Sequence, residues 1–293
     1  MKAAVGIDIG GSNVKAVRLV EGEIEEQTVR PTPETVAGIL EAAADLATRL
    51  GSGLPLGVGL AGLVDHRRGV LVWAPHLPGA EVAVSAPLGE QLGVDVTVDN
   101  DANLASYGEH VAGGGRGTTL TITVGTGIGM GVVVDGEIFH GRAHAGEVGH
   151  MTVEPNGAPC PCGRRGCWET VVSGRRLTSD AVAVLGAGSD VSDLASAAVD
   201  GHPAAAARLD EAGRWLAWGI EALVLAFDPH EVVLGGGVAA VGDFLLGPVR
   251  QRLAATEGAE RRRGTTVRVG ILGPYAGAIG AAMAATRAHE GMT

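Results

Sequence analysis

Three shortages in the sequence restrict what this protein can be. Its 293 residues include only three cysteines, an odd number that cannot all pair within one chain. Positive charge is scarce: 22 lysines and arginines stand against 33 aspartates and glutamates, and a net charge of -11 disfavours nucleic acid or an anionic membrane as a partner. No apolar run is long enough to cross a bilayer, since residues 216–227 are interrupted by Glu221.

The remaining composition is that of a globular protein, with 46% hydrophobic and 19% charged residues. A length of 293 residues suits two domains of ordinary size. An apolar strand pattern begins at once, so we expect no signal peptide and a cytoplasmic, reducing location where disulfides are rare. The one dense basic run, at residues 261–263, is explained by a solvated loop.

Residues 146–169 contain all three cysteines and are the most distinctive stretch of the chain. Cys160, Cys162 and Cys167 lie in a Pro/Gly-rich loop that is too short to bury a core of its own, so its shape needs another source of stability. A tetrahedral zinc bound by three thiolates and one imidazole would provide it, and His150 is the preferred fourth ligand. Such a complete ligand set leaves no position for water, which predicts a structural role.

The cysteine loop also admits alternatives to this zinc site. His140 and His144 are alternative fourth ligands. A disulfide between Cys160 and Cys162 would close a tight, strained ring and leave one thiol over. Free buried cysteines are disfavoured because the neighbouring glycine, proline and arginine residues do not form an apolar core.

The chain opens with three predicted strands, at residues 3–9, 14–20 and 23–30. The glycine-rich turn between the first two lets backbone N–H groups approach an anion, and Lys15 adds a positive charge. Asp8, at the end of the first strand, can hold Mg2+ through water. An ordinary hairpin with solvated Asp8 and Lys15 is the alternative.

A second glycine turn repeats this pattern. After a linker at 113–117, we expect a strand at 118–124, the turn at 125–131 and short strands at 131–134 and 137–139. The repetition predicts two related halves that each aim a glycine turn at a shared cleft.

A cluster of polar side chains follows a predicted strand at residues 94–98. Four of the five residues at 99–103 are Asp or Asn, and an alanine-rich helix begins there. The carboxyl ends of strands carry the chemistry of α/β sheets, so a carboxylate here is a candidate general base, although a helix N-cap is the simpler alternative.

The remaining expected elements complete an α/β pattern. Trp215 and Trp218, three residues apart on a long helix, are expected in the core. Gly235, Gly236, Gly237 and Val238 form a strand-to-helix turn that can lie against a flat ligand such as a nucleobase. The elements are helices at 34–50, 175–185, 191–200, 204–227, about 244–253 and from 276, the last packing back on the N-terminal half, and strands at 56–61, 231–234 and 266–272.

These motifs together resemble the ROK family of sugar kinases and sugar-responsive repressors, in the actin-like, ribonuclease H-like superfamily, over nearly the whole chain. The most specific part is Glu147-x-x-His150 followed by the cysteine series and Glu169, with the segments 99–103 and 125–129 only slightly less so. The resemblance implies a two-lobed α/β fold with an ATP and sugar cleft. It implies an N-terminal lobe at 1–112, completed by a helix at about 276–293, and a C-terminal lobe at 113–275 with the zinc loop and nucleotide-binding elements.

The resemblance also implies roles for individual residues, with Asp101 as the general base that takes the proton of the attacking hydroxyl, usually on C6 of the sugar. Mg2+ accompanies ATP. The sugar-binding residues are Gly62, Asn100, Asp101, Glu147, His150 and Glu169. The residues around the nucleotide are Asp8, Gly10, Gly11, Ser12, Asn13, Lys15, Gly125, Thr126, Gly127, Gly129, Gly235, Gly236 and Gly237. The zinc ligands are His150, Cys160, Cys162 and Cys167.

One stretch departs from the family pattern. Family glucokinases often carry Asn-Leu-Pro-Gly-Trp near the sugar, and here His76 and Ala80 replace the Asn and the Trp. Glucose is the first expectation, with N-acetylglucosamine, N-acetylmannosamine, fructose or a cyclitol as alternatives. A sugar-sensing repressor is disfavoured because the chain begins directly at a strand, without a helix-turn-helix, and a non-catalytic sugar-binding protein is the second rival. Polyphosphate is an alternative donor, and the resemblance suggests a homodimer or tetramer.

Overall fold

The computed structural model of the chain describes residues 2–237, 241–255 and 265–292. These residues form two compact units. Unit 1 comprises Met1–Gly115, Gly131–Gly146 and Ile271–Thr293, and unit 2 comprises Arg116–Met130 and Glu147–Gly270. The segment 131–146, which the predicted boundary at 112/113 assigns to the C-terminal lobe, groups with unit 1; the division into two lobes stays a prediction.

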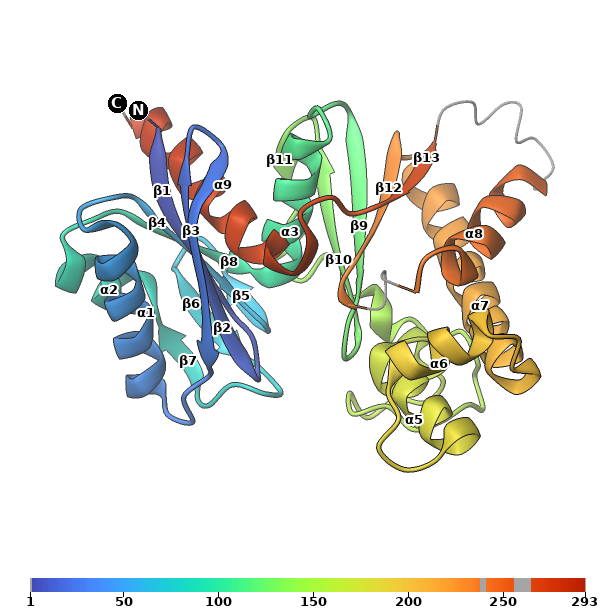
Figure 1. Cartoon of the computed structure of the whole chain (residues 1–293). Coiled ribbons are helices and arrows are strands. Elements are labelled where there is room, and N and C mark those ends of the chain that lie inside the picture. The colour runs from blue at the N-terminus through green and yellow to red at the C-terminus, as the bar shows by residue number, and fades with distance from the viewer. Residues whose placement is uncertain (1, 238–240, 256–264, 293) are drawn as a thin grey trace. The chain divides into compact units, whose positions relative to one another are not determined.

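Unit 1 contains a mixed five-stranded sheet in the order β3-β2-β1-β4-β8 (Figure 1). The first three strands form an antiparallel meander, while β4 and β8 continue it in parallel with β1. The strand bounds are β1 Ala3–Ile9, β2 Asn13–Val20, β3 Glu23–Pro31, β4 Leu56–Leu60 and β8 Val96–Asn100. The segments at 3–9, 14–20 and 23–30 therefore form the predicted strands, of which the third is mostly exposed.

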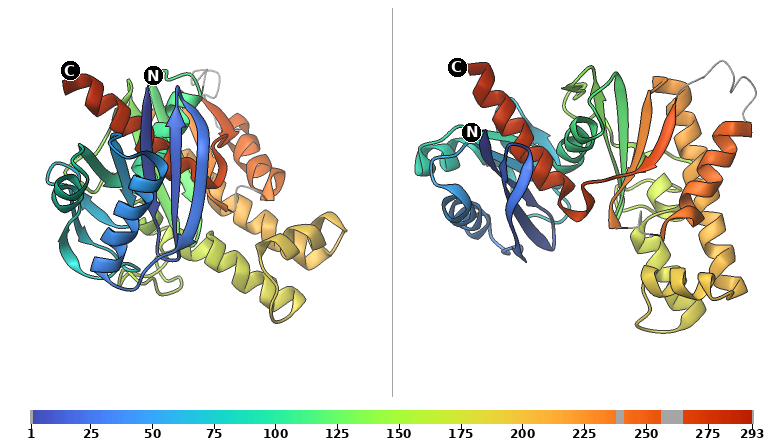
Figure 2. Two further views of the ribbon diagram at one scale, coloured as in Figure 1. Left: turned by 60° about the vertical axis from the view of Figure 1, so that its left-hand side comes forward. Right: turned by 45° about the horizontal axis from the view of Figure 1, so that its top comes forward.

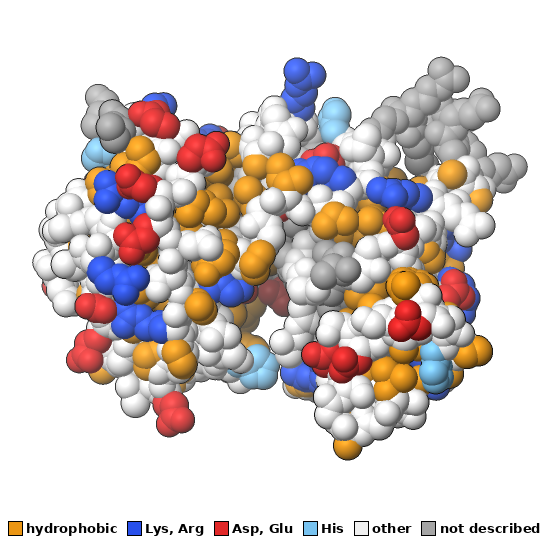
Figure 3. Space-filling model, viewed as in Figure 1, with side chains coloured by type: hydrophobic (Ala, Val, Ile, Leu, Met, Phe, Trp, Pro, Cys, Tyr) orange, Lys and Arg blue, Asp and Glu red, His pale blue; other side chains and the backbone are white. Residues whose placement is uncertain are grey.

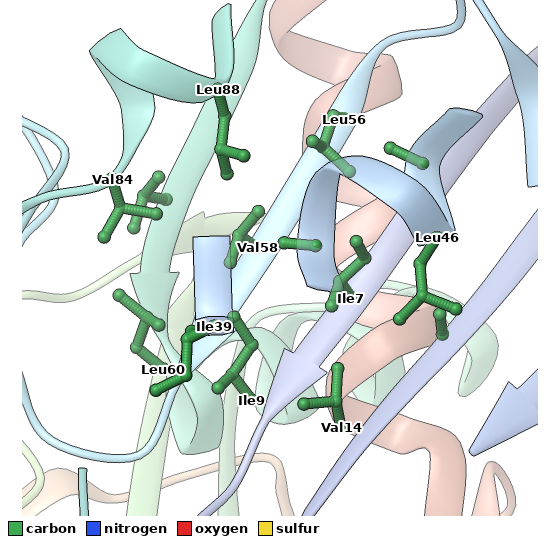
Figure 4. Close-up of a cluster of buried hydrophobic side chains, with 14 of the residues drawn as sticks. Ile7, Ile9, Val14, Ile39, Leu46, Leu56, Val58, Leu60, Val84 and Leu88 are labelled. Atoms are coloured by element: carbon green, nitrogen blue, oxygen red, sulfur yellow. The ribbon is translucent and has the colours of Figure 1, made fainter. Parts of the chain in front are cut away.

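Two helices bury the two faces of this sheet. Helix α1 (Val36–Gly51) begins after the N-cap Thr35 and covers one face with the stripe that includes Ile39, Ala43 and Leu50. Figure 4 shows Ile39 and Leu46 of this helix beside Ile7, Val58 and Leu60 of the strands. The other face is covered by α9 (Ala276–Met292), whose small side chains allow a close approach; Figure 2 shows the helix along the sheet in both views.

Unit 1 also contains two further helices, α2 and α3, and a small second sheet. Helix α3 packs on α9, as expected for a C-terminal helix that returns to the N-terminal half. A small antiparallel sheet has the order β5-β6-β7. The bounds are β5 Leu63–Asp65, β6 Val70–Trp73, β7 Ala80–Ala83, α2 Ser85–Leu92 and α3 Asp101–Ala112.

A second five-stranded sheet has the order β11-β10-β9-β12-β13. It repeats the plan of the first sheet, with a three-strand meander extended by two strands parallel to its first member. The predicted internal repeat is thereby confirmed. The bounds are β9 Thr118–Val124, β10 Ile128–Val134, β11 Glu137–Ile138, β12 Glu231–Gly235 and β13 Thr266–Val269.

The helices of unit 2 begin and end close to the predicted residues. Helix α6 starts in a complete capping box at Asp190 and Asp193, and α7 starts with Pro203 in its first turn. Two 3-10 helices, Val148–His150 and Gly273–Tyr275, and the helices α4 Trp168–Val171, α5 Gly174–Leu185, α6 Val191–Val199, α7 Pro203–Phe227 and α8 Asp243–Ala255 complete the described chain.

The prediction that both tryptophans of α7 lie in the core is wrong. Trp218 is 44% exposed and Trp215 is only partly buried. The two rings meet edge to face with centroids 4.8 Å apart, and the Arg252 guanidinium lies 5.7 Å from the Trp218 ring. The buried stripe of α7 runs instead through residues such as Leu216 and Ile220, so the tryptophans lie at its edge, beside α8.

The surface carries charged side chains of both signs, as the composition leads one to expect. On the face shown in Figure 3, acidic and basic side chains of the described residues are interspersed. Residues 261–263, the basic run of the sequence, lie outside the described residues. Within the described chain, no helix combines the length and the apolar character that crossing a bilayer requires.

Candidate functional site

In unit 1 the polar cluster lies where β8 ends and α3 begins. Asn100 is the N-cap of α3, and its side-chain oxygen accepts hydrogen bonds from the N–H groups of Ala102 at 2.9 Å and Asn103 at 3.1 Å. Its amide nitrogen donates to the Gly62 carbonyl at 3.0 Å. Both lone pairs of the oxygen are thus used, and one amide hydrogen is left, so Asn100 can offer a ligand only a donor.

Asp101 is the first residue of α3 and is half-buried. Its carboxylate accepts the N–H of Ala102 at 2.9 Å, and it faces the positive end of the helix, which favours a negative charge there. The N-cap explanation belongs to Asn100, so the carboxylate of Asp101 is not the N-cap of this helix.

The turn between β1 and β2 contains the predicted phosphate loop. Asp8 and Lys15 are directly paired across the two strands. Burial raises the pKa of the Asp8 carboxyl to about 6, and the charge of Lys15 opposes this rise. The Lys15 ammonium donates to the Pro274 carbonyl at 2.8 Å. A half-buried carboxylate whose negative charge is only partly compensated is a suitable ligand for a cation, which fits the residue to Mg2+.

The segment at residues 76–80, which differs from the family pattern at His76 and Ala80, begins beside this loop. A methyl group on Gly11 would lie 2.7 Å from the Cβ atom of His76, so His76 is in close contact with the glycine turn, and its side chain is exposed. Ala80 is exposed too and pairs with Trp73 across β6 and β7. His76 therefore lies beside the predicted phosphate turn, and Ala80 pairs with Trp73, whose carbonyl a methyl group on Gly62 would meet at 2.6 Å.

In unit 2 the second glycine turn packs against Glu169. A methyl group on Gly127 would lie 2.4 Å from Oε2 of Glu169, so the glycine lets this carboxylate lie close to the turn. The Gly125 carbonyl accepts the N–H of Gly174, at the start of α5, at 2.7 Å. A methyl group on Gly149, in the 3-10 helix that ends at His150, would likewise meet the Ile128 carbonyl at 2.2 Å.

The cysteine loop forms a cluster of four potential metal ligands. The ligand atoms of His150, Cys160, Cys162 and Cys167 all lie within 4.8 Å of one another. The Cys162 and Cys167 sulfurs are 3.6 Å apart, and Nδ1 of His150 is 3.6 Å from the Cys160 sulfur. In a tetrahedral zinc site with Zn–S bonds of about 2.3 Å the sulfurs are about 3.8 Å apart, so the donors fit this ion.

The thiols of this cluster differ in their environments. Burial raises the pKa of the Cys160 thiol, which also contacts Oε1 of Glu169 at 3.1 Å. Burial alone would raise the pKa of Cys162 as well, but hydrogen bonds from Arg164 and from the other two thiols lower it to about 6. The lowered pKa of Cys162 favours the thiolate, which is the form that binds a metal.

Trp168 joins the cysteine loop to the helical part of unit 2. Its ring is fully buried, and its N–H donates to the Trp215 carbonyl of α7 at 3.0 Å. The ring lies against Gly219, where a methyl group would come within 2.1 Å of it. The backbone of Trp168 in turn donates to the Met151 carbonyl at 2.8 Å, beside His150.

The remaining predicted residues are placed as follows. Oε2 of Glu147 is 3.9 Å from Nε2 of His150. Gly235 ends β12, and Gly236 has a positive φ of 84° against the backbone of Val124. Val238, predicted beside the adenosine, lies outside the described residues.

The alternative fourth ligands do not join the cysteine cluster. His140 belongs to unit 1, where its Nε2 lies 2.6 Å from Oδ2 of Asp99, and the cluster contains neither His140 nor His144. The sequence did not predict the Asp99–His140 contact. The only signal in the sequence was the acidic residue next to Asn100. Its partner, His140, is 41 residues away along the chain, and the sequence does not show that the fold brings the two together.

Two sheets of the same strand order, each flanked by helices, define the actin-like, ribonuclease H-like α/β class, which confirms the predicted fold class. Residues 4–288 match the ROK family, and the chain belongs to this family.

Relatives cover the chain almost completely. The glucokinase of Streptomyces coelicolor is 33% identical over 96% of this chain and 97% of its own length. The crystal structure of a ROK family glucokinase from Streptomyces griseus in complex with glucose and AMPPNP aligns with a TM-score of 0.85 and 33% identity, over 97% of this chain and 99% of that one. A ROK hexokinase from Thermus thermophilus aligns with a TM-score of 0.83 and 35% identity over 99% of both chains.

Proposed function

We propose that the protein transfers the terminal phosphoryl group of ATP to a hydroxyl of a hexose, with C6 of glucose as the leading case. The observation that carries this proposal is the full-length match to a glucokinase that was solved with glucose and AMPPNP. The strand-end position of Asp101 supports it, because this carboxylate lies at the start of α3 beside a donor-only amide, Asn100.

In the proposed reaction, Asp101 is the general base. A primary alcohol is a poor nucleophile, so the carboxylate takes the proton of the C6 hydroxyl while the oxygen forms its bond to the terminal phosphorus. The bond between this phosphorus and the bridging oxygen breaks, and ADP leaves. The position at a helix N-terminus supports this role, because the helix favours the carboxylate form that accepts the proton.

In unit 1 the proposed sugar-binding residues are Gly62 and Asn100, whose remaining amide hydrogen is available to donate to a hydroxyl. In unit 2 they are Glu147, His150 and Glu169. His150 has two roles, because Nδ1 faces the Cys160 sulfur while Nε2 points toward Glu147 and can donate to the sugar.

Each unit contains one glycine turn that we propose binds phosphate. The turn of unit 1 offers backbone N–H groups of residues 10–13 and the Lys15 ammonium, and the turn of unit 2 offers N–H groups of residues 125–129, all of which suit a negatively charged group. Asp8 holds Mg2+, which shields the phosphate oxygens when it is bound, and the turn at 235–237 lies beside the adenosine. Polyphosphate stays an alternative donor.

His150, Cys160, Cys162 and Cys167 bind a structural zinc. The ligand distances support this, and so does the lowered pKa of the Cys162 thiol. The ion fixes the loop that carries His150 and Glu169, so the zinc acts on the sugar site through the positions of these two side chains.

The identity of the sugar depends on few contacts. His76 and Ala80 change two residues near the predicted site, so an N-acetylhexosamine, fructose or a cyclitol stays an alternative to glucose. We further propose a cytoplasmic homodimer or tetramer, on the family resemblance alone.

The proposal is tested by release of ADP from ATP over a panel of sugars that includes glucose, mannose, fructose, N-acetylglucosamine, N-acetylmannosamine and a cyclitol. We expect turnover with at least one sugar and the highest kcat/KM with glucose. Repeating the panel with polyphosphate identifies the donor. Sugar binding by calorimetry without turnover of any sugar would instead identify a non-catalytic sugar-binding protein.

A further inference from the structure

Asp99 is a carboxylate buried next to the proposed general base. Only 5% of the residue is exposed. Its Oδ1 accepts the N–H of Asn100 at 2.7 Å and the side-chain amide of Asn103 at 3.0 Å. Its Oδ2 accepts Nε2–H of His140 at 2.6 Å. A buried carboxylate is tolerated only when it is paired and hydrogen-bonded, and these three contacts meet that need.

His140 is the ionisable partner in this set. Asp99 and His140 side chains are only 7% and 19% exposed, so their contact is shielded from water. The ring of His66 stacks on that of His140, with centroids 3.6 Å apart and an angle of 11° between the planes. Burial, followed by the neighbouring His140, lowers the pKa of His66, so His66 covers the pair as a neutral ring.

The hydrogen bonds connect His140 to the start of α3. Asp99 holds the backbone of Asn100 through one oxygen and the side chain of Asn103 through the same atom. These contacts fix the last residue of β8 and the first turn of α3, which begins at Asp101. The chain segments around residues 66, 99 and 140 thus converge on the base of the predicted sugar site.

We infer that His140 is a positioning residue for phosphoryl transfer, acting through Asp99 to hold Asn100 and Asp101 in their reactive orientation. This inference rests on the proposed function. Without a donor at position 140, Oδ2 of Asp99 loses its partner, and the carboxylate must draw in water or turn away. Either change displaces the start of α3, and a displacement of about 1 Å at a reacting group costs on the order of a hundredfold in rate.

The test removes the hydrogen-bond donor at position 140 while keeping an aromatic ring there. His140→Phe retains the stack on His66 but donates no hydrogen bond, and we expect kcat to fall by about 10- to 100-fold with the KM for ATP unchanged. His140→Gln, whose amide reaches the former Nε2 position, should recover most of the loss, whereas the shorter His140→Asn should not. His66→Phe is the matched control, because it keeps the stack and leaves the Asp99 contact, so its kcat should equal that of the wild type.

Two further readouts separate positioning from packing. The wild type should show a strongly downfield imidazole N–H proton resonance, unaffected in His66→Phe and lost in His140→Phe, whether or not sugar is turned over. In a double-mutant cycle, His140→Phe should reduce kcat little further once Asp99 is Asn, because both changes break one contact. Independent effects that multiply would overturn the role of His140.

The outcomes also distinguish this inference from the proposed function. An inactive wild type on every sugar would overturn the proposed function itself. An active wild type with full kcat in His140→Phe overturns only the role of His140. If His140→Phe fails to fold, the comparison of Gln with Asn at position 140 decides, and equal kcat values for these two variants would refute the inference.

Discussion

Three aspartates of unit 1 show how environment assigns roles to one side-chain type. Asp99 is buried and fully hydrogen-bonded, and Asp8 is half-buried beside one lysine. Asp101 stands at a helix N-terminus. The sequence predicted Asp99 and Asp101 in one polar cluster and Asp8 at a separate glycine turn. Only the contacts separate a residue that organises its neighbours from the proposed proton acceptor.

Replacing Asp101 tests the proposed base. Asp101→Asn keeps the size of the side chain but cannot take a proton, so kcat should fall by roughly a hundredfold or more while sugar affinity changes little. Steady-state kinetics and calorimetry with the best sugar measure the two quantities. Asp95→Asn, at an exposed aspartate before β8, is the control and should be fully active. Turnover of Asp101→Asn equal to that of the control would remove this residue from the mechanism.

Asp8 gives a prediction on the pH dependence of stability. Its pKa is raised from 3.8 to about 6, so the folded protein binds this proton more tightly than the unfolded chain, and stability is lost as pH rises between these values. Without Mg2+ and nucleotide, Asp8→Asn should therefore raise the free energy of unfolding by about 1–3 kcal/mol at pH 7.5, and the gain should shrink toward pH 4.

Urea unfolding at several pH values measures the effect of Asp8→Asn. Asp95→Asn again serves as the comparison, and its difference from the wild type should stay small across the same range. If Asp8→Asn raised the free energy of unfolding by the same amount at every pH, the ionised Asp8 carboxylate would not be a source of instability.

At the scale of elements, the glycines of β1 and β4 determine how closely α9 packs. A methyl group on Gly57 would lie 1.9 Å from the Ala281 carbonyl, a backbone atom that cannot move aside without the helix. Helix α9 also supplies Ala278 and Ala282 to the core on this face of the sheet. Small residues on both sides therefore replace the usual interlocking of large side chains.

Gly57→Ala should consequently destabilise the protein by about 1–3 kcal/mol, because the added methyl group pushes α9 from the sheet. The same substitution at Gly291, at the exposed end of α9, meets no atom within 4 Å and should leave stability unchanged or raise it by up to about 1 kcal/mol through helix propensity. Thermal unfolding of both variants gives the comparison. Equal stabilities for the two would mean that the sheet accommodates the methyl group without moving α9.

The elements were predictable where one physical signal dominates. Strands β1 and β9 are apolar runs bounded by glycine turns, and both were identified within one residue. The exposure of Trp218 was not predictable, because a spacing of three also fits the edge of a buried stripe. The cluster of His150 and the three cysteines was predictable because these residues are close in sequence, whereas the partner of His140 depends on the fold.

At the scale of the whole molecule, the cysteine loop belongs to one unit alone. We predict one zinc per chain by metal analysis, and little or none in Cys160→Ser. Removal of the metal should increase hydrogen exchange in residues 148–169 and, through Trp168, in the facing turns of α7. The sheet β3-β2-β1-β4-β8 of unit 1 should keep its protection. Equal loss of protection in both units would contradict a local role for the ion.

The arrangement of the chain has a consequence for its synthesis. Unit 2 needs no residue beyond Gly270, whereas unit 1 includes the stretch from Ile271 to the end. On the ribosome, β1 emerges before α9, and the apolar face that it shares with Ala278 and Ala282 stays uncovered until α9 has been translated. Unit 1 therefore cannot bury this face until α9 has been made. A message truncated before α9 would yield a product that exposes the face to chaperones and proteases.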